Sequence, residues 1–124
     1  MDNQQKITYT ENCLEFLNYK CITQGDKDFK IYEGKNNNLP NMIDANFNDS
    51  FLNNWNWIFE VVEAIEKLGY YTKNECIRNI NYFNIYELEN NEATFYGTDN
   101  SKKEAVVEAI NQFLIWHKTN NNEK

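Results

Sequence analysis

The chain has 124 residues, the size of one domain with a single modest core. Its formal net charge of −7 and its single arginine disfavour the basic surfaces that bind nucleic acids or anionic membranes directly. The first residues are polar and no apolar run approaches the length of a membrane span, so neither a signal peptide nor a transmembrane helix is predicted.

The cysteines Cys13, Cys21 and Cys76 are odd in number and lack the spacing of a metal site. Disulfide frameworks are typical of oxidising compartments. We therefore expect reduced, mostly buried thiols in a cytoplasmic protein.

The N-terminal part predicts a short helix and a hairpin. Thr8 and Glu11 have the spacing of a capping box, which predicts a helix over 8–18. The β-type segments 19–23 and 28–33 flank turn-forming residues, so they predict an antiparallel hairpin.

Residues 34–49 contain an asparagine run and the only proline, Pro40. A stretch of this length without a regular pattern is either disordered or functional, for instance as a lid over a site.

A long amphipathic helix is predicted next. Asp49 or Ser50 would cap it, and Gly69 stands where a left-handed residue ends a helix. Its apolar positions recur at helical spacing: Phe51, Trp55, Ile58, Val61, Val62, Ile65 and Leu68.

Three segments with β-type composition follow, and Tyr70 and Tyr71 open the first of them. Cys76 and Ile77 belong to the same pattern, which continues over 82–88 and 93–96. Asn90 and Asn91 predict a hairpin turn between the last two segments.

Ser101 and Glu104 form a second capping box, which begins a helix that is expected to end near Lys118. Residues 119–124 are predicted to be a flexible tail. The inward positions are expected to be Val106, Ala109, Ile110, Phe113 and either Trp116 or His117.

These patterns predict an α+β fold with an antiparallel sheet of about four strands. Two long helices and one short N-terminal helix would pack on that sheet. We expect one domain over 1–124, ordered over about 8–118.

Five residues are candidates for binding a ligand. Trp55 and Trp57 are about 200° apart on a helix, so we expect one to face the core. The other would lie on a surface, in a second layer or at an oligomer interface. Arg78 could pair with a phosphate or a carboxylate. Lys102 and Lys103 stand at a helix N-terminus, which favours anions.

Catalytic and metal sites are not predicted. The chain has one histidine, His117, near its end, without a recognisable nucleophile or orienting group. No zinc, EF-hand or glycine-rich phosphate motif is present. We therefore predict a non-enzymatic protein without a cofactor.

Several motifs follow one another along the chain: Trp55-x-Trp57, Val61-Val62-Glu63, Leu68-Gly69-Tyr70, a β-hairpin, Lys103-Glu104-Ala105-Val106 and Phe113-x-x-Trp116. This order resembles that of small phage and prophage proteins of the phage ABA sandwich domain family. The resemblance covers roughly residues 10–116. It implies a phage-encoded accessory protein with helices packed on an antiparallel sheet, and it carries over no catalytic residue.

Two functions are compatible with this reading. The first is binding that counteracts a bacterial host defence, by sequestering a nucleotide-type immune signal in the host cytoplasm. The second is an acidic inhibitor that binds a host defence enzyme or nuclease, which the charge of −7 favours. An aromatic-rich small domain is also compatible with a homodimer or a higher homo-oligomer.

Overall fold

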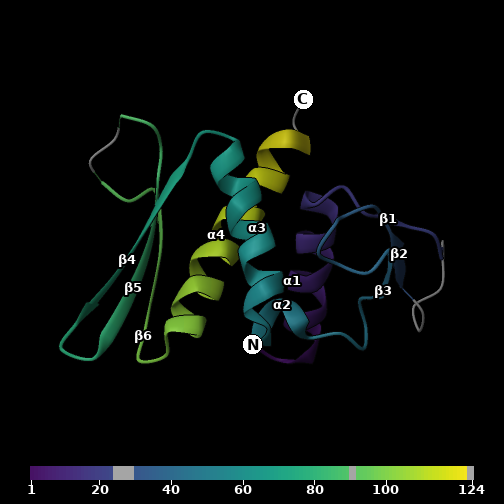
Figure 1. The fold of residues 1–124 in the computed structure, drawn as a ribbon, viewed down its shortest axis with the longest axis horizontal. Coiled ribbons are helices and arrows are strands. Elements are labelled where there is room, and N and C mark those ends of the chain that lie inside the picture. Colours follow the sequence, from purple (N-terminus) through teal and green to yellow (C-terminus); the bar gives the residue numbers. More distant parts are fainter. Residues whose placement is uncertain (24–29, 90–91, 123–124) are drawn as a thin grey trace.

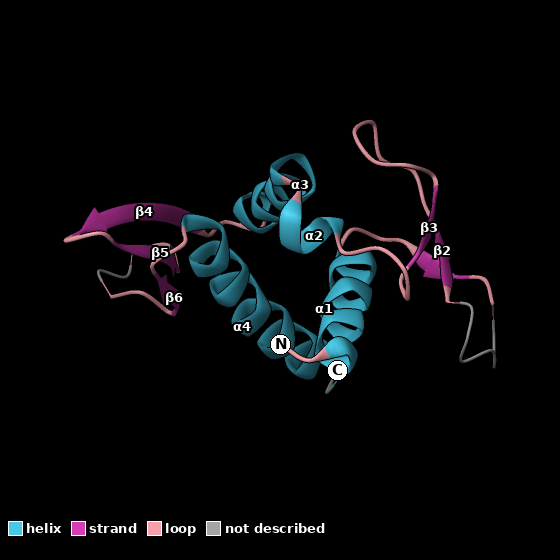
Figure 2. Cartoon of the chain, turned by 90° about the horizontal axis from the view of Figure 1, so that it is seen from below, coloured by secondary structure: helices cyan, strands magenta, loops and turns pink. Residues whose placement is uncertain are grey.

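The computed structural model of the chain describes residues 1–23, 30–89 and 92–122. Helices occupy the middle of the molecule, and one small antiparallel sheet lies at each side of them (Figures 1 and 2). Each sheet has three strands, in the orders β1-β2-β3 and β4-β5-β6. The α+β class is confirmed, but two separate sheets replace the predicted single sheet of about four strands.

Helix α1 spans Asn3–Phe16 and begins five residues before the predicted start. Asp2 is its N-cap: the Asp2 carboxylate accepts a hydrogen bond from the Gln5 amide, and the Gln5 side chain accepts one from the Asp2 amide, both at 2.8 Å. This reciprocal capping box precedes the expected one, so Thr8 lies inside the helix.

The first sheet consists of β1 (Lys20–Cys21), β2 (Ile31–Glu33) and β3 (Met42–Asp44), all antiparallel. The predicted hairpin of β1 and β2 is present, whereas its turn lies outside the described residues. The interpretation of 34–49 as an irregular loop is wrong in part, because β3 pairs with β2 along its whole length. Its central Ile43 is buried, as is the β2 residue opposite, Tyr32.

The predicted first long helix is two helices, α2 (Ser50–Asn53) and α3 (Trp55–Lys67). Asn54 separates them in an extended conformation, and its side chain accepts a hydrogen bond from the Asn56 amide at 2.9 Å. Asparagine competes well for backbone groups in this way, so it caps a new helix where the apolar pattern continues. Gly69 follows α3 with a φ of 103°, as predicted.

The second sheet consists of β4 (Tyr71–Ile77), β5 (Ile80–Tyr86) and β6 (Phe95–Asp99). Both pairings are antiparallel, as expected, although β5 begins two residues earlier than predicted. Arg78 and Asn79 have positive φ values, 52° and 68°, which two-residue hairpin turns require. The predicted turn at Asn90 and Asn91 lies outside the described residues.

Helix α4 spans Lys102–Asn122, four residues beyond its expected end. The Ser101 hydroxyl accepts a hydrogen bond from the Glu104 amide at 3.4 Å, which is one half of the predicted capping box. Of the alternatives for the last inward position, His117 is half-buried and Trp116 is exposed. The other predicted inward residues are buried: Val106, Ala109, Ile110 and Phe113.

The core lies between the helices and the inner faces of both sheets. Cys13 is buried in it, but Cys21 and Cys76 are exposed, so the expectation of mostly buried thiols is wrong. Within the described ranges, no helix is long and apolar enough to cross a lipid bilayer.

Candidate ligand-binding cleft

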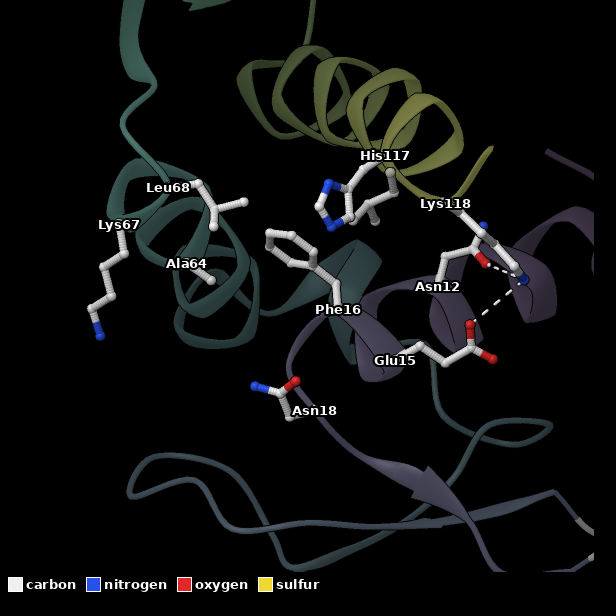
Figure 3. A pocket seen from close by; sticks show the side chains of 10 residues that line it. Asn12, Glu15, Phe16, Asn18, Ala64, Lys67, Leu68, His117 and Lys118 are labelled. Carbon is white, nitrogen blue, oxygen red and sulfur yellow. Dashed lines mark hydrogen bonds and ion pairs between the residues drawn. The ribbon is translucent and has the colours of Figure 1, made fainter. Parts of the chain in front are cut away.

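A cleft of about 530 Å³ opens where α1 and α3 end and the last turns of α4 pass beside them (Figure 3). The three helices run in the same general direction, so their C-terminal turns lie at the same end of the molecule (Figure 1). Its lining comes from all three helices, from Asn18 shortly after α1 and from Leu68 directly after α3. The lining residues are Asn12, Glu15, Phe16, Asn18, Ala64, Lys67, Leu68, Leu114, His117 and Lys118.

One wall of the cleft is aromatic. The Phe16 ring lies between Leu68 and the His117 imidazole (Figure 3). The Phe16 and His117 rings meet edge to face with centroids 5.2 Å apart, and His117 stacks on the buried Phe113 at 5.5 Å. Phe113 is one helical turn from His117, so α4 itself holds the imidazole in place. The wall is therefore built from rings that the core supports.

The opposite wall is polar. The Lys118 ammonium donates a hydrogen bond to the Asn12 carboxamide oxygen at 3.3 Å and lies 3.5 Å from the Glu15 carboxylate (Figure 3). Asn12 is 7% exposed, whereas the Lys118 and Glu15 side chains are about half exposed. An ion pair this open to solvent contributes about 0–1 kcal/mol. A bound ligand could therefore replace it at small cost.

Burial lowers the pKa of His117 below its ordinary value. The imidazole is consequently neutral at pH 7, with one nitrogen able to donate a hydrogen bond and the other able to accept one. Helix C-termini carry partial negative charge, and Lys67 and Lys118 place positive charge near those ends. The cleft thus combines apolar rings, neutral hydrogen-bonding groups and ammonium groups.

The five predicted ligand-binding residues lie outside this cleft. Trp55 and Lys103 come together at the other end of the helices, where the Lys103 ammonium lies 5.5 Å from the Trp55 ring centroid. The same ammonium donates a hydrogen bond to the Asn53 carbonyl at 2.8 Å, and Trp55 stacks on Phe59 at 5.2 Å. The structure therefore brings two of the five residues together, in a contact that also joins α3 to α4.

The remaining three predicted residues, Trp57, Arg78 and Lys102, do not join that pair. Trp57 packs edge to face on Phe51, with centroids 5.0 Å apart. Both tryptophans are half-buried and pack against the core, so neither ring is fully inward or fully exposed. Arg78 is exposed in the β4–β5 turn, at the outer edge of the molecule, and Lys102 is exposed at the start of α4 (Figure 1).

Sequence reasoning missed Asn12, Phe16 and Lys118, which line the cleft together with His117. Nothing in the sequence aligns α1 beside the end of α4. Among the described residues, no group of three or more histidine, cysteine and acidic side chains is placed to hold a metal ion.

Comparison of the chain with protein-family models, with curated proteins and with solved structures gives no match.

Proposed function

We propose that this protein is a non-enzymatic, phage-encoded binding protein that counteracts a bacterial host defence. In this proposal it sequesters a nucleotide-type immune signal in the cytoplasm of the host. The phage context comes from the sequence resemblance. The observation that supports the ligand class is the cleft, which is lined by a phenylalanine ring, an imidazole, two carboxamides and two lysines.

A nucleotide matches the chemistry of the two walls. Its base would lie against Leu68, Phe16 and His117, because flat rings gain from aromatic and apolar contact. The carboxamide of Asn18 offers a donor and an acceptor to the edge of a base. An anionic group would take the place of Glu15 at the Lys118 ammonium, which is 3.5 Å from that carboxylate.

The size and lining of the cleft favour binding over turnover. Its volume of about 530 Å³ falls in the range of roughly 300–1,000 Å³ that is typical of small-molecule sites. Its lining holds one imidazole and neither a serine, a threonine nor a cysteine that would act as a nucleophile.

Isothermal titration calorimetry with adenosine and guanosine monophosphates, ADP-ribose and cyclic dinucleotides tests the proposal. We expect at least one of them to bind, and Lys118→Ala to weaken that binding by about tenfold, or ~1.4 kcal/mol. Lys103→Ala is the matched control, because it removes an ammonium group from the Trp55 contact at the other end of the helices.

Two results would overturn the proposal. The first is the absence of any heat of binding with every member of the panel at a protein concentration of about 100 μM. This concentration is roughly 10⁵-fold above the nanomolar dissociation constant that sequestration requires. The second is binding that depends on Lys103 and not on Lys118. In the first case the alternative function, inhibition of a host defence enzyme by an acidic surface, becomes the one to test.

A further inference from the structure

The outer face of the second sheet is rich in tyrosine and is not covered by a helix. Helix α4 packs against one side of β5 and β6, where Phe83, Ile85 and Phe95 are buried (Figures 1 and 2). Side chains alternate along a strand, so the residues between them point away from α4. This outer face comprises Tyr71, Lys73, Glu75, Ile77, Ile80, Tyr82, Asn84, Tyr86, Tyr96 and Thr98.

The register brings the aromatic side chains of the outer face together. Tyr71 lies opposite Tyr86, and their rings stack with centroids 4.7 Å apart and an interplanar angle of 9°. Tyr96 is opposite Asn84 and is 55% exposed. The face thus carries four of the eight tyrosines of the chain. Tyrosine is enriched at protein–protein interfaces because it offers large area at low cost in conformational entropy.

The charge on the outer face favours a second copy of the chain as its partner. Lys73 and Glu75 are the charged residues of the face, and they form an ion pair at 2.8 Å, so the face is neutral. The whole chain has a net charge of −7. Two copies of such a chain repel each other wherever acidic surfaces meet, and a neutral face is where they can approach.

We propose that the outer face of the second sheet binds the same face of a second copy of this chain, which forms a two-fold symmetric dimer. A two-fold axis that passes close to position 74 of β4 would place Lys73 of each copy near Glu75 of the other, because every contact across an isologous interface occurs twice. The tyrosines would supply the apolar contact, and the ion pairs between the two copies would fix how the two faces are aligned.

The size of the outer face sets the expected affinity. Strands β4 and β5 have seven residues each, so the face is about 23 Å long. A face of this length and three strands wide is smaller than the ~800 Å² that each partner buries in a standard stable complex. We therefore expect a dissociation constant in the micromolar range.

Sedimentation velocity over a concentration range from about 1 to 500 μM, which spans that micromolar range, tests the dimer. We expect a reversible increase from the monomer to the dimer mass. Higher salt should strengthen the dimer, because it screens the repulsion between two chains of charge −7.

Tyr96→Lys should raise the dissociation constant of the dimer at least tenfold. Phe47→Lys is the matched control, since Phe47 is 79% exposed on the side of the molecule that carries the first sheet.

Charge reversal on the outer face gives a sharper test. Lys73→Glu leaves two carboxylates on the face and Glu75→Lys leaves two ammonium groups, so each variant alone should be monomeric. An equimolar mixture of the two variants should form a heterodimer, which native mass spectrometry distinguishes by mass. Circular dichroism of each variant verifies that it is folded.

A wild-type protein that stays monomeric over the whole range would overturn the proposal. So would a dimer that Tyr96→Lys leaves unchanged, or charge-reversed variants that do not pair when mixed. If the charge-reversed variants fail to fold, the wild-type series and Tyr96→Lys decide the question.

Discussion

Gly97 of β6 lies directly against the backbone of Ala105 in α4. A Cβ atom at position 97 would lie 1.8 Å from the Ala105 carbonyl oxygen and 2.9 Å from the Ala109 amide nitrogen. Backbone atoms of a helix cannot move aside in the way that a flexible side chain can. The missing side chain at position 97 is therefore what allows α4 to lie close to the second sheet.

Gly97→Ala should consequently destabilise the protein. Overpacking in a well-packed core costs about 1–3 kcal/mol, and we expect the upper part of this range because the added methyl meets backbone. Urea denaturation followed by circular dichroism measures the change. Thr98→Ala is the control, because Thr98 is exposed on the same strand and should change the free energy of unfolding little. A similar loss in both variants would contradict the steric explanation.

The contact of Lys103 with Trp55 predicts a difference between two adjacent lysines. Lys103→Ala removes the cation–π contact at 5.5 Å and the hydrogen bond to the Asn53 carbonyl, both of which tie α4 to the α2–α3 junction. We expect a loss of about 1 kcal/mol in the free energy of unfolding. Lys102→Ala removes an exposed lysine of the same helix turn. Equal effects of the two substitutions in urea denaturation would count against this role of Lys103.

Local signals predicted the strands that form the second sheet and most of the helices before and after them, although not that these strands form a sheet of their own. The apolar pattern ending at Gly69, the β-type segments and the Ser101 cap are all determined by residues close together in the sequence. Where two local signals competed, the prediction was wrong. Asp2 and Gln5 cap α1 although Thr8 and Glu11 match the same motif, and Asn54 divides a continuous apolar pattern because its side chain caps α3.

Contacts between distant segments decided what the sequence could not predict. Strand β3 forms because it pairs with β2, and its own three residues give no strong β signal. The cleft joins Asn12 to Lys118 across 106 positions of the chain. Helical geometry places Trp55 and Trp57 on different sides of α3, but Phe51 of α2 packs on Trp57 and Lys103 of α4 lies over Trp55, so both rings are half-buried.

Glu60 attaches the segment after β2 to α3. The Asn36 side-chain amide donates a hydrogen bond to one Glu60 carboxylate oxygen at 3.2 Å, and the Asn38 side-chain amide donates to the other. We expect Glu60→Ala to speed amide hydrogen exchange in residues 34–41 by about tenfold, or ~1.4 kcal/mol of local opening free energy. Glu63→Ala, on an exposed position of α3, should leave that exchange unchanged. Unaltered exchange in both variants would show that these hydrogen bonds do not restrain the segment.

The three thiols should differ sharply in reactivity. Burial raises the pKa of the Cys13 thiol, and the side chain has no exposed surface, whereas Cys21 and Cys76 are exposed. The thiolate is the reactive form, so Cys13 should react only when the protein unfolds. Mass spectrometry after a brief treatment with a maleimide should show two labels on the native chain and three in urea. Rapid labelling of Cys13 in the native protein would contradict its burial in the core.

His117 should make stability depend on pH. Its pKa in the folded state is below the ordinary value of 6.5, because burial disfavours the charged imidazolium. The unfolded chain therefore binds a proton more readily than the folded one, and stability falls as the pH drops through 6.5 towards the folded pKa. The loss is complete once the pH lies below the folded pKa, where His117 is protonated in both states.

The variant His117→Phe tests this dependence, because it keeps a ring against Phe16 and Phe113 but cannot titrate. The difference in unfolding free energy between wild type and His117→Phe, measured by urea denaturation between pH 8 and pH 5, should be constant above about pH 7.5 and should shift in favour of the variant below about pH 6.5. Carboxylates titrate in both proteins and cancel in this difference. A difference that does not vary with pH, or that shifts in favour of the wild type, would mean that the imidazole is not buried in the folded protein.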